Sequence, residues 1–134
     1  MLAGCGSSPR AVAYQDLTRE LGALAFTHIT VDVSHSRREL LGVLARNNPG
    51  VKVHVPRIDF AHREAFLVAV GPRSSTGYAL RVVRVHRIGG HVDVVVHEQT
   101  PSLGEPVQAR VTYPFLLLSL ASDKPVYLKM MGRP

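Results

Sequence analysis

The sequence contains no tryptophan and only one cysteine among its 134 residues. A single cysteine excludes an internal disulfide and any zinc site built on several thiolates. Aromatic residues make up 6% of the chain, which leaves few platforms for stacking nucleic-acid bases. No apolar run approaches the ~20 residues that a membrane-spanning helix needs. What remains is a chain of single-domain length with 46% hydrophobic residues, enough to form a globular core.

The charge balance is basic, with 16 Lys and Arg against 10 Asp and Glu, a formal net charge of +6. Such a balance favours acidic partners, such as nucleic acid or anionic lipid headgroups. However, 13 of the 16 basic residues are Arg, and Asn and Gln are scarce. This usage is also typical of a GC-rich or heat-adapted genome, an explanation to which we give more weight. The sequence therefore predicts no nucleic-acid partner.

The only cysteine, Cys5, lies in the segment Leu2-Ala3-Gly4-Cys5 and is followed by Gly6-Ser7-Ser8. This segment resembles the lipobox of bacterial lipoproteins, which implies a lipid on Cys5 and an extracytoplasmic domain held at the cell envelope. Residues 1–10 are then a lipobox remnant and a flexible tether. The basic and apolar regions of a signal peptide do not precede Leu2 in the given sequence, so this form is expected to be soluble and unlipidated.

Residues 11–134 are predicted to form one β-rich domain. The segment 28–33 alternates apolar and polar residues, and 66–70 is a continuous apolar run typical of a strand buried on both faces. Further strands are predicted within 11–25 and at 51–55, 78–88, 91–98, 107–111, 115–120 and 126–130. Short turns between consecutive strands indicate mainly antiparallel pairing, closed as a sandwich or a barrel.

Three local signals refine this fold. Ser36, with Glu39 three residues later, has the spacing of a capping box and starts a short helix over about residues 36–46. Gly89-Gly90 is a two-residue hairpin signal. The doublet Val82-Val83 predicts a β-bulge that brings Arg81 and Arg84 to the same solvent-facing side. The fold class is therefore mainly β, an antiparallel sandwich or barrel-like domain with one short helix.

The histidines do not have the spacing of a metal site. His91, Asp93 and His97 share one strand face, but Asp93 and His97 are four residues apart, roughly 13 Å along a strand. Ligands of one zinc ion cannot span that distance. For nucleophilic catalysis, Ser74 and Ser75 are the only candidates, and neither lies in a Gly-x-Ser-x-Gly elbow. The sequence therefore predicts no enzyme, no metal and no cofactor.

Several ordered steps in the second half resemble the PrcB C-terminal domain family of bacterial lipoproteins and secreted domains. They are Ile58-Asp59-Phe60, the strand Ala65–Val70, the loop Gly71–Tyr78, Pro101 and Thr112-Tyr113-Pro114-Phe115, spread over residues 58–120. The loop departs from the family pattern, since Ser74 replaces Pro and Thr76 replaces Gly. The resemblance implies a non-enzymatic subunit with a protein partner, an accessory or stabilising subunit of a surface protease. Asp59 is expected to accept backbone N–H bonds near Ala61 and His62.

A second, weaker resemblance gives the alternative function. Ser75-Thr76-Gly77-Tyr78 is similar to a loop of chagasin-type cysteine protease inhibitors, although these also use a tryptophan that this chain lacks.

Both resemblances point to the loop before the 78–88 strand as a protein-recognition device. The residues predicted to bind a partner are Arg73, Ser74, Ser75, Thr76, Gly77 and Tyr78. The alternative is a connector, in which the hydroxyls bond neighbouring strands, Gly77 supplies a positive φ and Tyr78 is part of the core.

Overall fold

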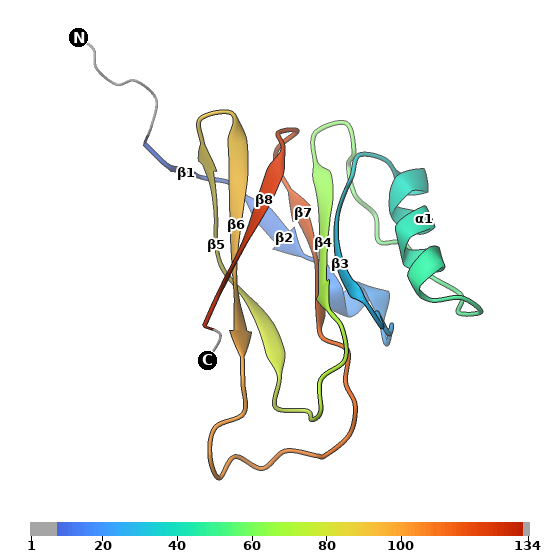
Figure 1. Cartoon of the computed structure of the whole chain (residues 1–134). Coiled ribbons are helices and arrows are strands. Elements are labelled where there is room, and N and C mark those ends of the chain that lie inside the picture. Colours follow the sequence, from blue (N-terminus) through green and yellow to red (C-terminus); the bar gives the residue numbers. More distant parts are fainter. Residues whose placement is uncertain (1–7, 133–134) are drawn as a thin grey trace.

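The computed structural model describes residues 8–132 and consists of two four-stranded sheets and one α-helix (Figure 1). Sheet A has the strand order β1 (Arg10–Ala11), β5 (Ala79–Ile88), β6 (His91–Gln99) and β8 (Val126–Met131). Sheet B has the order β2 (Tyr14–Asp16), β7 (Phe115–Leu120), β4 (Glu64–Val70) and β3 (Ile29–Ser34). Helix α1 (Arg37–Asn47) lies on the side of sheet B that faces away from sheet A (Figure 1), and a short 3₁₀ helix, η1, spans Thr18–Leu21.

The sheets form a sandwich, as the sequence predicted. Within residues 8–132 they remain two separate sheets, so the barrel is not formed. Pairing is antiparallel except between β6 and β8, which run parallel. After β6 the chain crosses to sheet B, forms β7 there, and then returns to sheet A as β8. Because of this crossover, β8 runs in the same direction as β6.

The core has two layers, one on each face of sheet B. From β4, Phe66 and Val68 face sheet A, whereas Ala65, Leu67 and Ala69 face helix α1. Strand β7 alternates in the same way. The continuous apolar run at 66–70 is thus a central strand buried on both faces, as predicted.

Helix α1 begins with the predicted cap. The Oγ of Ser36 accepts a hydrogen bond from the backbone N–H of Glu39 at 3.1 Å. The Glu39 carboxylate accepts from the N–H of His35, one residue before the cap, at 2.8 Å. The observed bounds, 37–47, differ from the predicted 36–46 by one residue at each end.

The predicted β-bulge is also present. The register between β5 and β6 shifts between Val82 and Arg84, so that Arg81 pairs with His97 and Arg84 with Val95. Because the bulge absorbs one residue, Arg81 and Arg84 both lie on the outer face of sheet A. Gly89, at a φ of +59°, supplies the left-handed turn of the β5–β6 hairpin.

Two predicted strands are wrong. Residues 51–55 form no strand, and the C=O of Val55 accepts from Nη1 of Arg37 at 3.2 Å instead of joining a sheet. Residues 107–111 lie in a long loop, where Val111 is exposed. The backbone there pairs with the loop before β5 instead of a strand, as described below.

The N-terminal predictions lie mostly outside this structure. Residues 1–7, which include Cys5, are outside the described residues. In residues 8–132, no helix is long and apolar enough to cross a membrane.

Candidate functional site

Arg73 anchors the start of the predicted partner-binding loop to sheet A. Its Nε lies 2.5 Å from Oε2 of Glu98 and its Nη2 lies 3.1 Å from Oε1. Its Nη1 donates to the C=O of Val70 and of Pro72, each at 3.0 Å, and its backbone forms a β-bridge with Thr112. The hydrogen bond to Glu98 raises the pKa of Arg73. The guanidinium, the only charged group of the loop, is therefore engaged inside the fold.

The loop hydroxyls also bond groups of this chain. The Oγ of Ser75 accepts from the N–H of Gly77 at 3.2 Å, and the Oγ1 of Thr76 accepts from the N–H of Gln108 at 2.9 Å. In return, the N–H of Thr76 donates to the C=O of Gln108, and the hydroxyl of Thr112 donates to the C=O of Ser75. The bonds with Gln108 and Thr112 join the loop Gly71–Tyr78 to the loop of residues 101–114.

Gly77 is required by crowding, not by its backbone angles. A Cβ at this position would lie 2.5 Å from Cβ of Pro101 and 2.8 Å from Cγ1 of Val107. The positive φ considered for Gly77 is not found; it occurs at Gly71, at +81°. Close packing at Gly77 thus holds the two loops together.

The predicted loop residues alternate between inward and outward positions. Ser75 and Gly77 are buried and Arg73 is three-quarters buried, whereas Ser74 and Thr76 are exposed and Tyr78 is half-buried. The structure thus leaves Ser74, Thr76 and Tyr78 accessible.

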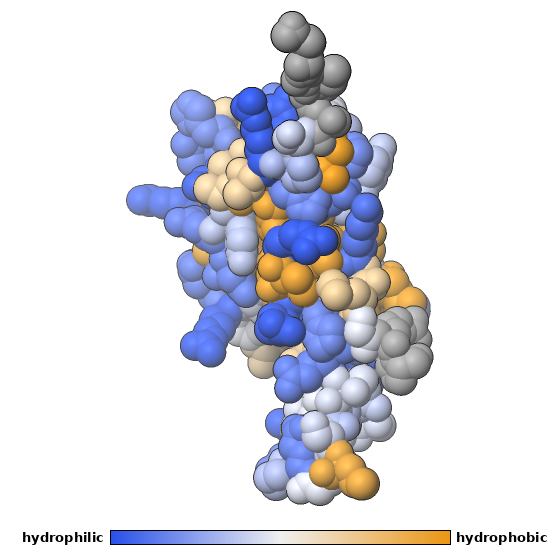
Figure 2. Space-filling model, turned by 90° about the vertical axis from the view of Figure 1, so that its left-hand side faces the viewer, coloured by the Kyte–Doolittle hydropathy of each residue, from blue (hydrophilic) through white to orange (hydrophobic). Residues whose placement is uncertain are grey.

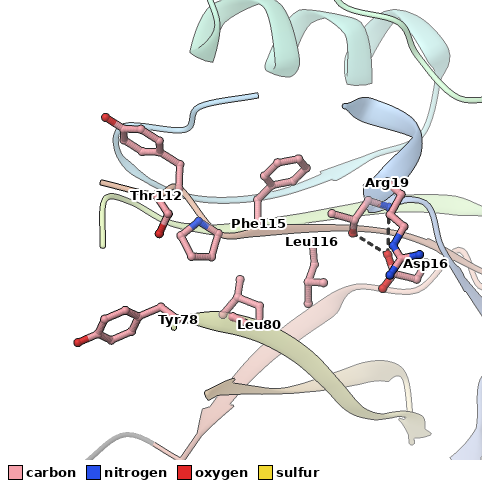
Figure 3. Close-up of a pocket in the computed structure, with 11 residues that line it drawn as sticks. Asp16, Arg19, Tyr78, Leu80, Thr112, Phe115 and Leu116 are labelled. Atoms are coloured by element: carbon pink, nitrogen blue, oxygen red, sulfur yellow. Dashed lines mark hydrogen bonds between the residues drawn. The ribbon is translucent and has the colours of Figure 1, made fainter. Parts of the chain in front are cut away.

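Beside Tyr78 lies a groove of about 580 Å³ between the start of β5 and the start of β7 (Figure 3), which we name the β5–β7 groove. Figure 3 shows Leu80 and Leu116 pointing toward each other across it, while the ring of Phe115 points to the other face of sheet B. There the ring centroid of Phe115 lies 5.0 Å from that of Phe26. The apolar part of the groove is lined by Tyr78, Leu80, Tyr113, Pro114, Phe115 and Leu116.

One end of the groove is polar and fixed by hydrogen bonds. Asp16 Oδ1 accepts from the backbone N–H of Thr18 at 3.0 Å and from its hydroxyl at 2.6 Å. The Thr18 Oγ1 in turn accepts from the N–H of Leu117 at 3.0 Å. Arg19 also lines this end. The apolar part of the β5–β7 groove therefore ends beside the Arg19 guanidinium and the Asp16 carboxylate.

Sequence reasoning found only part of this groove. Tyr78 is one of the predicted partner-binding residues, whereas Tyr113 and Pro114 belong to a step of the resemblance for which the sequence predicts no role. Asp16, Thr18 and Arg19 were missed because they come from a distant segment with no motif of their own.

The other polar residues singled out have local partners. Asp59 accepts from the N–H of Ala61 at 3.2 Å and lies 2.8 Å from Nδ1 of His62, and the hydrogen bond with His62 lowers the pKa of Asp59. This confirms the predicted turn, although the N–H of His62 donates to the Asp59 C=O instead. His91 Nε2 lies 3.0 Å from Oδ1 of Asp93. In the described part of the chain, no three His, Cys, Asp or Glu side chains gather as a metal site.

Comparison with known proteins supports the resemblance seen in the sequence. Residues 65–121 match the family model described as PrcB C-terminal. The match includes β4, the loop Gly71–Tyr78, the β5–β6 hairpin and β7, and it begins after Ile58-Asp59-Phe60. No curated protein and no solved structure matches the chain.

Proposed function

Residues 65–121 belong to the PrcB C-terminal family, and from this premise we propose that the chain is a non-enzymatic accessory domain that binds an extended segment of a protein partner in the β5–β7 groove. The observation that carries the proposal is the unpaired edge of strand β5, which lies beside the apolar part of this groove. The partner we infer is a protease or another protein of the bacterial cell envelope that this domain stabilises.

The open edge belongs to β5. Strand β1 pairs with β5 only at His86 and Arg87, and the N–H of Val12 adds one bond to the C=O of Val85. From Ala79 to Arg84 this edge has no strand partner among residues 8–132. An unpaired edge is a template for β-augmentation, in which a peptide adds a strand through main-chain hydrogen bonds.

The opposite wall also directs backbone groups to the groove. Leu117 uses its N–H and C=O to bond Thr18 Oγ1 and the N–H of Leu17 on the outer side of β7. Phe115, two residues earlier on the same strand, directs its own N–H and C=O to that side. A segment in the groove therefore meets main-chain partners at its edges and apolar side chains in between, which favours an extended, largely apolar peptide.

Absence of catalysis and attachment to the envelope are parts of the same proposal. In its support, the hydroxyl of Ser75, one of the two candidate nucleophiles, accepts a hydrogen bond from the backbone N–H of Gly77 instead of bonding a histidine. Cys5, in its lipobox-like setting, is the proposed site of a lipid that holds the domain outside the cytoplasm. Two or three acyl chains anchor stably, whereas one binds only marginally.

Site-directed cross-linking tests the groove. A photoreactive benzoylphenylalanine replaces Tyr78, at the mouth of the groove, in the protein expressed in its native membranes. A matched control places the same group at Tyr127, on the outer face of sheet A. We expect a discrete cross-linked product from position 78 that Leu80→Arg abolishes. Equal products from both positions, or a product that Leu80→Arg leaves unchanged, would contradict binding in the groove.

Two further assays separate the other parts of the proposal. Radiolabelled palmitate should enter the native protein and be absent from Cys5→Ser; unlabelled native protein in the soluble fraction would exclude the anchor. For the inhibitor alternative, the pure domain is titrated against a papain-type protease. Nanomolar loss of protease activity would replace the accessory role with inhibition.

A further inference from the structure

The outer face of sheet A forms a regular array of side chains. The register of β5, β6 and β8 places Arg84 and Lys129 on either side of Val95. One step along the strands in one direction, Arg81 and Met131 lie on either side of His97. In the other direction, His86 and Tyr127 lie on either side of Asp93. The bulge in β5 is what puts both arginines on this face.

The carboxylate in this array is neutralised within the fold. The Asp93 side chain is 1% exposed, and its Oδ2 lies 3.0 Å from Nζ of Lys129. His91 Nε2 is 3.0 Å from Oδ1, and His86 Nε2 is 3.7 Å from Oδ2. Burial raises the pKa of Asp93, but the Lys129 ammonium and the two imidazoles outweigh it and hold this pKa below its usual value. Asp93 is thus an internal counter-ion that adds no accessible negative charge.

Every exposed charge on the strands of sheet A is therefore positive. The acids on these strands, Asp93 and Glu98, are buried. The exposed charged residues are Arg10, Arg81, Arg84, Arg87 and Lys129. In the described part of the chain, no acidic side chain forms an ion pair with Arg81 or Arg84.

Apolar side chains accompany these cations. Tyr127 is 55% exposed and Met131 is 47% exposed, and Lys129 stands between them on β8. Figure 2 views this side of the molecule and shows apolar side chains gathered in its middle, with hydrophilic side chains around them. Lysine and arginine beside an exposed tyrosine and methionine are the combination that suits the boundary between lipid headgroups and acyl chains.

The N-terminal strand β1 forms one edge of the same sheet. Arg10 begins β1 at the edge of sheet A, and it comes five positions after Cys5 in the sequence. A fully extended chain spans at most about 3.5 Å per residue, so a lipid on Cys5 would hold this edge within roughly 20 Å of the membrane surface. We propose that the outer face of sheet A lies on an anionic lipid surface through Arg81, Arg84, Lys129 and Tyr127. Its orientation in the cell rests on the lipid anchor of the proposed function, but the contact itself needs no lipid on the protein.

Vesicle sedimentation of the full chain with Cys5 unmodified tests this contact. Phosphatidylcholine vesicles with phosphatidylglycerol should bind the protein, those without it should not, and added salt should weaken the binding. Removing one arginine near an anionic surface lowers binding about fivefold, so Arg81→Gln/Arg84→Gln should lower it about 25-fold. The matched control is Arg38→Gln/Arg46→Gln on helix α1, which changes the net charge equally and should leave binding within about twofold.

A second measurement reports which face makes contact. Because the chain has no tryptophan, Tyr127→Trp introduces a single tryptophan on this face, and Leu41→Trp places one on the exposed side of α1. Excitation at about 295 nm avoids the tyrosines. The emission of Tyr127→Trp should shift to shorter wavelength with anionic vesicles, whereas that of Leu41→Trp should not.

The outcomes decide between surfaces and ligands. Equal losses from both double variants, or a shift only in Leu41→Trp, would overturn the assignment of this face. Tighter binding to duplex DNA than to the anionic vesicles, lost in Arg81→Gln/Arg84→Gln, would identify nucleic acid as the ligand instead. Failure of palmitate labelling would remove the anchor while leaving these results intact.

Discussion

Removing the guanidinium of Arg73 should destabilise the domain more than removing any exposed arginine. Arg73→Met deletes the contacts of this group with two Glu98 oxygens and two backbone carbonyls. It also leaves Glu98, 6% exposed in its side chain, without its counter-ion. Breaking a buried pair in this way costs about 3–5 kcal/mol, and we expect about 3 kcal/mol because Arg73 is 25% exposed. For a domain of this size, that lowers Tm by roughly 10 °C.

Urea denaturation followed by far-UV circular dichroism measures this loss. Arg87→Met, an exposed arginine of β5, is the matched control and should change the free energy of unfolding by less than about 0.5 kcal/mol. Glu98→Gln retains an acceptor for Arg73 and should cost less than Arg73→Met. If Arg73→Met lowers the free energy of unfolding by less than about 1 kcal/mol, close to the effect of the control, the structural role of Arg73 is refuted. Arg73 would then be better explained as a residue that binds the partner.

Three further predictions concern the two loops and the core. Ser75→Ala/Thr76→Ala removes two acceptors of backbone N–H bonds and should lower the free energy of unfolding by about 1–2 kcal/mol in the same titration; an unchanged Tm would show that the hydroxyls do not hold the loops. Gly77→Ala, which forces a Cβ against the neighbouring loop, should cost about 1–3 kcal/mol, and a Tm equal to that of wild type would contradict the close packing. Burial raises the pKa of Glu64, so its folded state holds the proton more tightly than the unfolded state. Its contribution to stability therefore falls as pH rises above the unfolded pKa. Glu64→Gln should raise Tm at neutral pH and gain less at acidic pH, as calorimetry at several pH values would show; a gain independent of pH would contradict the argument.

The pattern of apolar residues within a short segment correctly predicted the elements in which those residues are buried. The apolar run at 66–70 predicted a strand between two core layers. The Val82-Val83 doublet predicted the bulge that places Arg81 and Arg84 on the same face of β5. The pattern at 107–111 alternates equally well, yet no strand forms. Its neighbour in space is the irregular loop Gly71–Tyr78, to which residues 108–112 bond at Thr76 and Arg73. A segment of alternating apolar and polar residues forms a strand only where a neighbouring strand lies beside it and can pair with it.

The candidate site was less predictable for a related reason. Arg73 is the only charged residue of its loop, which suggests recognition, but its counter-ion Glu98 is 25 residues away on β6. The polar end of the groove comes from Asp16 and Arg19, almost 100 residues before β7 in the chain. These contacts depend on the pairing of distant strands, which no short window of sequence contains.

Hydrogen–deuterium exchange on the full chain, alone and bound to the partner identified by cross-linking at position 78, tests the central claim most directly. If the partner adds a strand in the β5–β7 groove, the amides within residues 79–84 that face the open edge of β5, and the amide of Phe115, should become protected, because they gain main-chain hydrogen bonds. Residues 37–47 of helix α1 should exchange as before. Protection confined to helix α1 or to β8, with residues 79–84 unchanged, would contradict the groove as the partner site.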